Sequence, residues 1–244
     1  MTLEFQILLI ILMAVMAFLY ASVGHGGASG YLALMAIFSI SPPLIKSSAL
    51  ILNIFVSFTA FLQFYRGGYF RWKFFLPFAL GSVPMSFIGA MLPISDSFYK
   101  KLLAVALLIA IARMLFNPSA KNITKNASIL GSLIIGASIG LLSGMLGIGG
   151  GIILTPVILL LNWANFKETA AVSALFIFVN SISGLIGLLS KGFTPNPQIW
   201  FWLVAAFTGG LFGAYFGSRK FNLPTLRYIL AVVLLVACFK LMIT

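Results

Sequence analysis

The chain has 244 residues, of which 61% are hydrophobic and 7% are charged, and it carries a net charge of +12. A soluble domain carries about 25% charged residues, and one core of this length could not bury so much apolar surface. Disorder is excluded as well, because it needs low hydrophobicity. We therefore expect an integral membrane protein that binds no nucleic acid, with its surplus basic residues on membrane loops.

Ten apolar runs follow one another along the chain. A bilayer core about 30 Å thick needs roughly 20 residues of helix, and most runs are long enough to span it. The second and seventh are not, because their 13 and 14 residues give only roughly 20 Å of helix. The runs cover residues 5–23, 28–40, 48–65, 74–92, 98–116, 128–146, 150–163, 169–190, 198–217 and 224–243.

A glycine cluster precedes each short run. Residues 24–27 read Gly-His-Gly-Gly, and residues 147–151 read Gly-Ile-Gly-Gly-Gly, with the two clusters 123 positions apart. This recurrence indicates an internal duplication. We predict one all-α polytopic membrane domain of two inverted repeats, 1–120 and 121–244, each with a glycine-broken helical hairpin or short half-helix plus three full transmembrane helices.

Loop charges indicate the threading, because cytoplasmic loops are enriched in Lys and Arg. If each glycine cluster joins two crossing segments, or a hairpin dipping in from one side, ten basic residues lie on one face and five on the other. If only the short segments are re-entrant, the split is eight to seven. The first arrangement is favoured, and it inverts the repeats and places both termini on the outer side of the plasma (inner) membrane. The ten are Arg66, Arg71, Lys73, Arg113, Lys121, Lys125, Lys167, Arg219, Lys220 and Arg227, and the five are Lys46, Lys100, Lys101, Lys191 and Lys240.

Consecutive glycines open a helix, because each costs roughly 1 kcal/mol of helix propensity relative to alanine. The exposed backbone N–H groups must face protein, water or a ligand, since lipid cannot satisfy them. Two helices that begin at such breaks near the membrane midplane would bind an anion without Arg or Lys. The alternative is that the glycines only permit a tight turn between helices. The substrate-binding candidates here are Gly24, Gly26, Gly27, Gly147, Gly149, Gly150 and Gly151.

Polar side chains inside the spans are further candidates. His25, the single histidine, would contact the anion or carry a coupling proton, unless it only caps a helix. Asn53 and Asn180 would donate amide hydrogens to an oxyanion, and each would equally bond a neighbouring helix. Ser29 and Thr155 follow the glycines closely enough to contact the same ligand. One histidine and one cysteine predict no metal site, and no cofactor is expected.

Residues 144–151 read Gly-Met-Leu-Gly-Ile-Gly-Gly-Gly and are followed by Pro156. This stretch resembles the glycine-rich signature of the TauE/SafE sulfite exporter family, also called the four-toluene-sulfonate uptake permeases. The first half departs from the signature, with alanine at positions 21, 28 and 33 in place of glycine, glycine and proline. The resemblance implies a membrane permease for sulfite, small organosulfonates or related anions.

Function is therefore expected to be transport. No HExxH pattern and no paired intramembrane carboxylate is present, so an enzyme is not expected. We predict a secondary transporter for a small sulfur-containing or organic oxyanion, working by alternating access with the substrate held at the glycine breaks. An anion channel and a non-transporting structural subunit are the alternatives. The expected partners are the small anion, the lipid bilayer and, through His25, a coupling proton.

Overall fold

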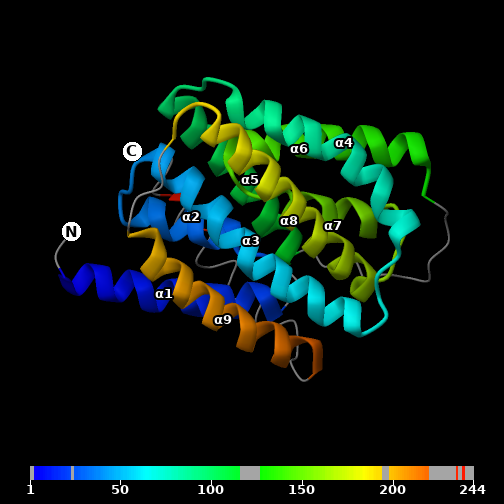
Figure 1. Ribbon diagram of the computed structural model, residues 1–244, viewed down its shortest axis with the longest axis horizontal. Helices are drawn as coiled ribbons and strands as arrows, with labels where there is room; N and C mark the ends of the chain where they lie inside the picture. The colour runs from blue at the N-terminus through cyan, green and yellow to red at the C-terminus, as the bar shows by residue number, and fades with distance from the viewer. Residues whose placement is uncertain are drawn as a thin grey trace.

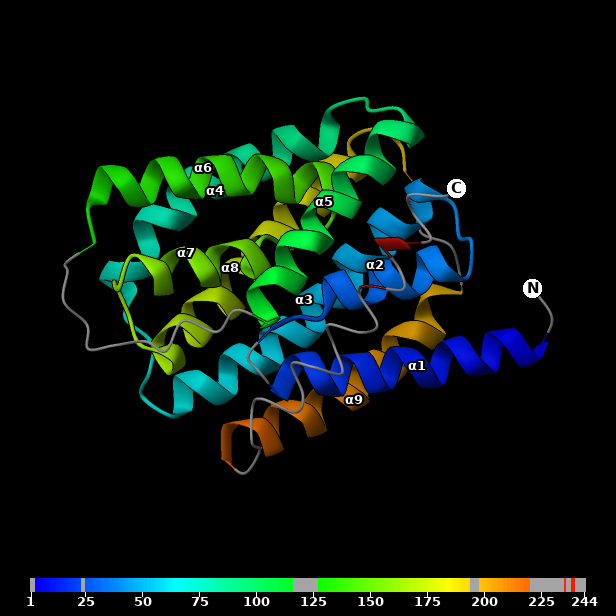
Figure 2. The same ribbon diagram turned by 180° about the vertical axis from the view of Figure 1, so that it is seen from behind.

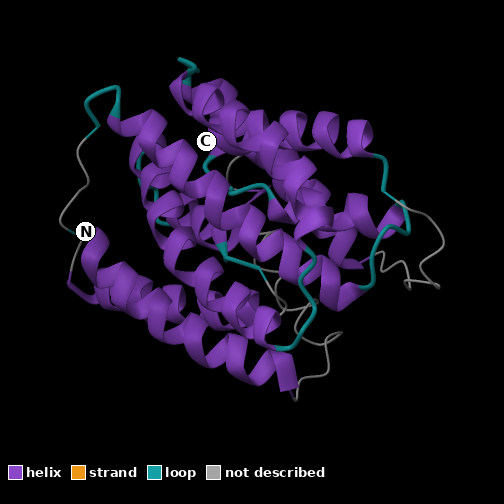
Figure 3. Ribbon diagram, turned by 45° about the vertical axis from the view of Figure 1, so that its right-hand side comes forward, coloured by secondary structure: helices purple, strands orange, loops and turns teal. Residues whose placement is uncertain are grey.

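The computed structural model describes residues 3–22, 25–115, 127–193 and 198–219, together with 235, 238 and 239. Within these ranges the chain forms nine α-helices and no strand, so the predicted all-helical fold is confirmed (Figure 3). Most of the tenth apolar run lies outside the described residues. The helices are α1 (Leu3–Ser22), α2 (Ala28–Ile37), α3 (Pro42–Arg66), α4 (Trp72–Met91), α5 (Asp96–Leu115), α6 (Ile129–Leu146), α7 (Gly151–Leu160), α8 (Phe166–Leu189) and α9 (Ile199–Arg219).

Six of the described helices are long and apolar enough to cross a membrane: α1, α3, α4, α6, α8 and α9. The short runs form α2 and α7, which have 10 residues each, and are therefore about 15 Å long. Both begin at a glycine in the left-handed region, Gly27 with φ 91° and Gly150 with φ 78°. A side chain rarely adopts this conformation, so the glycines break the chain into half-length helices.

The long helices lie in three layers along the long axis of the molecule (Figures 1 and 2). α4 packs on α6 in one outer layer, α1 packs on α9 in the other, and α3 packs on α8 between them. Glycines bring the outer pairs into backbone contact. A methyl group on Gly89 would overlap the carbonyl oxygen of Leu141, and one on Gly213 would overlap that of Phe18.

These pairings exchange when the two halves of the chain are exchanged. In chain order α1 corresponds to α6, and α4 corresponds to α9, so α1–α9 and α6–α4 are the same pairing. The half-helices follow the same rule, because α2 packs on α3 and α7 packs on α8. Each half therefore completes its outer layer with a helix from the other half, as two repeats related by a two-fold axis would.

Two connections are joined at one end of the bundle. The Arg71 guanidinium, before α4, forms an ion pair of 3.2 Å with Glu168 in the first turn of α8. Lys167 donates to the Tyr69 hydroxyl at 3.0 Å and lies over its ring. Glu168 also closes a capping box with Asn165, which fixes the start of α8. The α3–α4 and α7–α8 connections thus lie together, as the ten-to-five charge arrangement requires.

The opposite end gathers the connections that precede α3, precede α5 and follow α8. Here α3 begins at Pro42 rather than near residue 48, because two prolines occupy its first turn after the extended Ser41. Lys46, which we expected in a loop, therefore lies inside the helix and is only 8% exposed.

Candidate functional site

The two glycine breaks meet at one small cavity. Its volume is about 10 Å³, which is room for roughly one water molecule. Both halves of the chain therefore contribute to one small cavity. The cavity is lined by Tyr20, His25, Gly26, Gly27, Ala28, Ser29, Ile148, Ile152 and Ile177.

Asn53 of α3 lies between the breaks. A methyl group on Gly26 would lie 2.9 Å from its Oδ1, and one on Gly149 would lie 2.9 Å from its Nδ2. The side chain is fully buried, and neither amide atom has a hydrogen-bond partner within the described residues. A buried polar group without a partner costs roughly 1–3 kcal/mol. Both amide atoms of Asn53 are therefore available for a further hydrogen-bonding partner between the two glycines.

The neighbours of the two breaks also correspond to one another. Gly26 lies against Asn53 and Ile177, and Gly149 lies against the same two side chains. Asn53 and Ile177 are 124 positions apart, close to the 123 that separates the glycines. In their contacts with the two glycines, Ile177 of the second half therefore corresponds to Asn53 of the first half, although the second half also has an asparagine at position 180. One side of the meeting point is polar and the other is apolar.

Asn180 occupies a different environment, between α8 and α4. Its Nδ2 donates to Ser82 Oγ at 3.0 Å and to the Phe176 carbonyl at 2.8 Å. The Ser86 hydroxyl donates to the backbone carbonyl of Asn180 at 2.9 Å. The amide donors that we expected to face a substrate are thus engaged in joining two helices.

Neither half-helix has a side-chain cap at its N-terminus. The first N–H groups of an α-helix have no partner within the helix, and the helix dipole adds partial positive charge at the same place. Gly151, the first residue of α7, packs on Ile177, and Gly150 packs on Phe176. The positive ends of α2 and α7 therefore begin beside the buried Asn53.

His25 links the two halves directly. Its Nε2 lies 3.2 Å from Thr155 Oγ1. The Thr155 hydroxyl donates to the Gly151 carbonyl at 2.8 Å, and it lies 2.7 Å from Ser173 Oγ. The Thr155 hydroxyl on α7 is therefore in hydrogen-bond contact with His25 of the first half and with Ser173 of α8.

The remaining candidates are placed around this centre. Ser29 donates to the Tyr20 hydroxyl at 2.7 Å, which ties α2 to α1. Gly147 lies against the backbone of α3, where a methyl group would come within 2.8 Å of the Lys46 carbonyl oxygen. Gly24 lies outside the described residues. Among those residues, no group of three His, Cys, Asp or Glu side chains could hold a metal ion.

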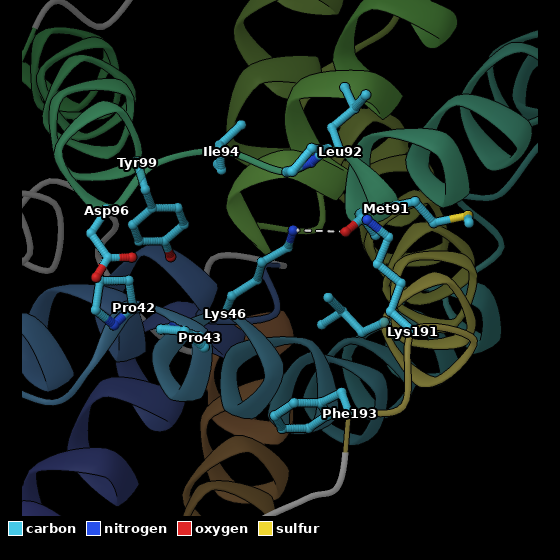
Figure 4. A pocket seen from close by; sticks show the side chains of 13 residues that line it. Pro42, Pro43, Lys46, Met91, Leu92, Ile94, Asp96, Tyr99, Lys191 and Phe193 are labelled. Atoms are coloured by element: carbon cyan, nitrogen blue, oxygen red, sulfur yellow. Dashed lines mark hydrogen bonds between the residues drawn. The ribbon is translucent and has the colours of Figure 1, made fainter.

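A larger cavity, which we call the vestibule, opens at the end of the bundle where α3 begins (Figure 4). Its volume is about 230 Å³. The Lys46 ammonium points into it and donates to the Ala90 carbonyl at 3.1 Å. The sequence reasoning missed this residue, although the Pro42-Pro43 pair signalled an earlier helix start. The vestibule is lined by Pro42, Pro43, Lys46, Ala90, Met91, Leu92, Pro93, Ile94, Asp96, Tyr99, Leu188, Lys191 and Phe193.

Membrane-length helices around two opposed half-helices, with buried polar groups where these meet, form the architecture of a membrane transporter. A family model described as sulfite exporter TauE/SafE matches residues 8–241, and the chain belongs to that family. It is 40% identical over 234 residues to the probable membrane transporter protein y4hK of Sinorhizobium fredii, covering 93% of this chain and 94% of that protein.

A second relative is the probable membrane transporter protein YunE of Bacillus subtilis. It is 26% identical over 226 residues, which cover 82% of this chain and 81% of YunE. No solved structure matches the chain. The chain is therefore a multi-pass membrane transporter of the TauE/SafE type.

Proposed function

We propose that the chain is a secondary transporter of the plasma membrane for a small oxyanion such as sulfite or a sulfonate. The substrate binds where the glycine breaks meet. Backbone N–H groups at the starts of α2 and α7 and the amide of Asn53 supply the donors. The names of the family and of its transporter members support the class of substrate and the activity, respectively.

The observation that carries this proposal is the amide of Asn53 between Gly26 and Gly149, which has no hydrogen-bond partner in the described part of the chain. Polar groups buried at membrane depth normally find partners, because the surroundings offer no water. An oxyanion accepts several N–H donors at once, and donors to a charged acceptor form stronger bonds than neutral ones. The site therefore favours an anion over a neutral solute.

The difference between the two ends of the bundle supports alternating access as the mechanism. The vestibule opens at the Lys46 end. At the other end, the Arg71–Glu168 ion pair lies over the buried cluster of Phe64, Ala170 and Ala171. We infer that the vestibule is the entrance and that it opens to the outer side of the membrane in this conformation. Transport then opens the opposite end of the bundle, where Arg71 and Glu168 form their ion pair. His25, bonded across the halves through Thr155, is the group we propose for proton coupling.

Uptake of sulfite into liposomes tests the proposal, with Gly149→Ala as the diagnostic variant. Its matched control is Gly192→Ala. Both glycines have positive φ, 69° and 78°, so alanine meets comparable backbone strain at each. Only at Gly149 does the new methyl group meet Asn53 and Ile177, since at Gly192 no atom of the described residues lies within 4 Å of it.

We expect Gly149→Ala to abolish uptake, and Gly192→Ala to retain it, while both variants elute as folded protein in size-exclusion chromatography. Equal uptake by the two variants would contradict the site. Wild-type uptake should saturate with sulfite concentration, because a carrier holds one substrate at a time. Single-channel currents in planar bilayers would instead favour a channel and rule out the carrier.

A further inference from the structure

The vestibule places a buried cation among apolar side chains, in front of the glycine breaks. Lys46 is 8% exposed. Its ammonium has three N–H donors, and the bond to the Ala90 carbonyl uses one. Lys191 lines the same cavity, and its positive charge repels that of Lys46. Asp96 also lines the vestibule, yet it forms no ion pair with either lysine among the described residues.

A buried charge without an opposite charge is costly, because it has lost much of its hydration. The carbonyl at the C-terminal end of α4 offsets part of this cost, since the helix dipole is negative there. The lining itself still carries two positive groups and one negative group. The vestibule therefore has room, in charge and in hydrogen bonding, for one negative group beside Lys46.

Most of the remaining lining is apolar, which selects the rest of the ligand. A cavity of about 150 Å³ holds a benzene ring, and the vestibule offers about 230 Å³. Apolar contact contributes roughly 25 cal/mol per Å², a gain that a small inorganic anion cannot make. The apolar lining includes Pro42, Pro43, Leu92, Ile94, Leu188 and Phe193.

The inner wall of the vestibule is continuous with the second glycine break. The Lys46 backbone lies against Gly147. The Tyr99 hydroxyl, which lines the vestibule, donates at 3.1 Å to the carbonyl of Leu146, the last residue of α6. A ligand bound at Lys46 therefore rests beside the break that begins α7.

We propose that the vestibule is a second anion site, separate from the glycine breaks, that binds an organic monoanion by its charged head at Lys46 and its apolar body against the lining. It rests on the proposed function in one respect, because we infer that the bound anion is a transport substrate on its way to the breaks. Its chemistry is shared by the headgroup of an anionic lipid, and the experiment separates the two sources.

The test uses the full chain in phosphatidylcholine nanodiscs, with benzenesulfonate binding measured by calorimetry. Lys46→Gln should weaken binding roughly tenfold or more, because a hydrogen bond to a charged group is lost. Lys46→Arg keeps the charge and should stay close to wild type, which controls for folding. Lys101→Gln removes an exposed charge near the vestibule end of α5 and should leave benzenesulfonate binding unchanged. Leu92→Ala should weaken benzenesulfonate binding more than sulfite binding.

Unchanged benzenesulfonate affinity in Lys46→Gln, with the protein folded, overturns the proposal and shows that Lys46 only caps α4. A difference between Lys46→Gln and wild type that appears only with phosphatidylglycerol present assigns the site to lipid, and overturns it as a substrate site. A result that contradicts substrate binding at the glycine breaks looks different. In that case Gly149→Ala transports normally, while Lys46→Gln still loses benzenesulfonate affinity.

Discussion

Arg71 and Glu168 form an ion pair of 3.2 Å between connections that are 97 positions apart in sequence. Arg71 is 49% exposed and Glu168 is 17% exposed, so the pair itself contributes about 0–1 kcal/mol to stability. Its position matters more than its energy. It fastens the α3–α4 connection over the start of α8, above the buried Ala171.

We predict that breaking this pair opens that end of the bundle without unfolding it. A reporter is Ala171→Cys, at a buried position, in a Cys238→Ser background. Arg71→Gln should raise its rate of labelling by a water-soluble maleimide several-fold, and should lower the unfolding temperature only slightly. Lys73→Gln removes the same charge nearby and should leave labelling unchanged. Identical labelling with and without Arg71→Gln would show that the ion pair does not hold the end closed.

A second prediction contrasts two asparagines under the same substitution. Asn53→Leu removes an amide that bonds to none of the described residues. It should leave the unfolding temperature unchanged or raise it, while sulfite uptake falls at least roughly tenfold. Asn180→Leu breaks bonds to Ser82 and Phe176, and should cost roughly 1–3 kcal/mol of stability.

Thermal unfolding and liposome uptake, measured on both variants, provide the check. If Asn53→Leu is the less stable variant and still transports, the Asn53 amide has a structural role and the ligand site lies elsewhere.

A third prediction concerns the close pairing of α4 and α6. A methyl group on Gly144 would overlap the Ser86 carbonyl oxygen, so Gly144→Ala must push the helices apart. Such overpacking costs roughly 1–3 kcal/mol. At Gly184 the nearest atom to a new methyl group is 3.4 Å away, which is ordinary contact. Gly184→Ala should therefore unfold at the wild-type temperature, whereas Gly144→Ala should unfold at a lower temperature. Equal unfolding temperatures would mean that the helices adjust freely.

A fourth prediction tests the bond between the halves. Thr155→Val keeps the shape of the side chain and removes the hydroxyl that contacts both His25 and Ser173. We expect slower transport and a loss of roughly 1–3 kcal/mol of stability, because buried polar side chains lose a hydrogen-bond partner. Thr155→Ser keeps the hydroxyl and should restore both quantities. Transport by Thr155→Val at the wild-type rate would exclude this contact from the mechanism.

Much of the fold was predictable because the governing signals are local. Apolar length located the helices, and the glycine clusters located the two breaks, since two or three consecutive glycines weaken a helix and leave backbone groups that lipid cannot satisfy. The predicted start of α3 near residue 48 was wrong, because the helix begins at Pro42. The apolar run begins only after Lys46, and the Pro42-Pro43 pair is the sequence feature that shows an earlier helix start.

The site was less predictable because its contacts are distant in sequence. Asn53 and Asn180 look equivalent along the chain, yet one lies between the breaks and the other bonds to α4. Their environments depend on which face of each helix meets its neighbour. A uniformly apolar helix gives no periodic signal for that choice. The vestibule was unpredictable for the same reason, because it forms where three connections that are distant in sequence meet.

The exchange of outer helices between the halves sets a condition on the history of the chain. α1 finds its partner in α9, and α6 finds its partner in α4, so neither half encloses its own helices. Expressed alone, a half would expose the glycine-lined faces that its missing partners cover. If the chain arose by duplication, a shorter ancestor with this packing would have needed a second copy of itself to cover those faces.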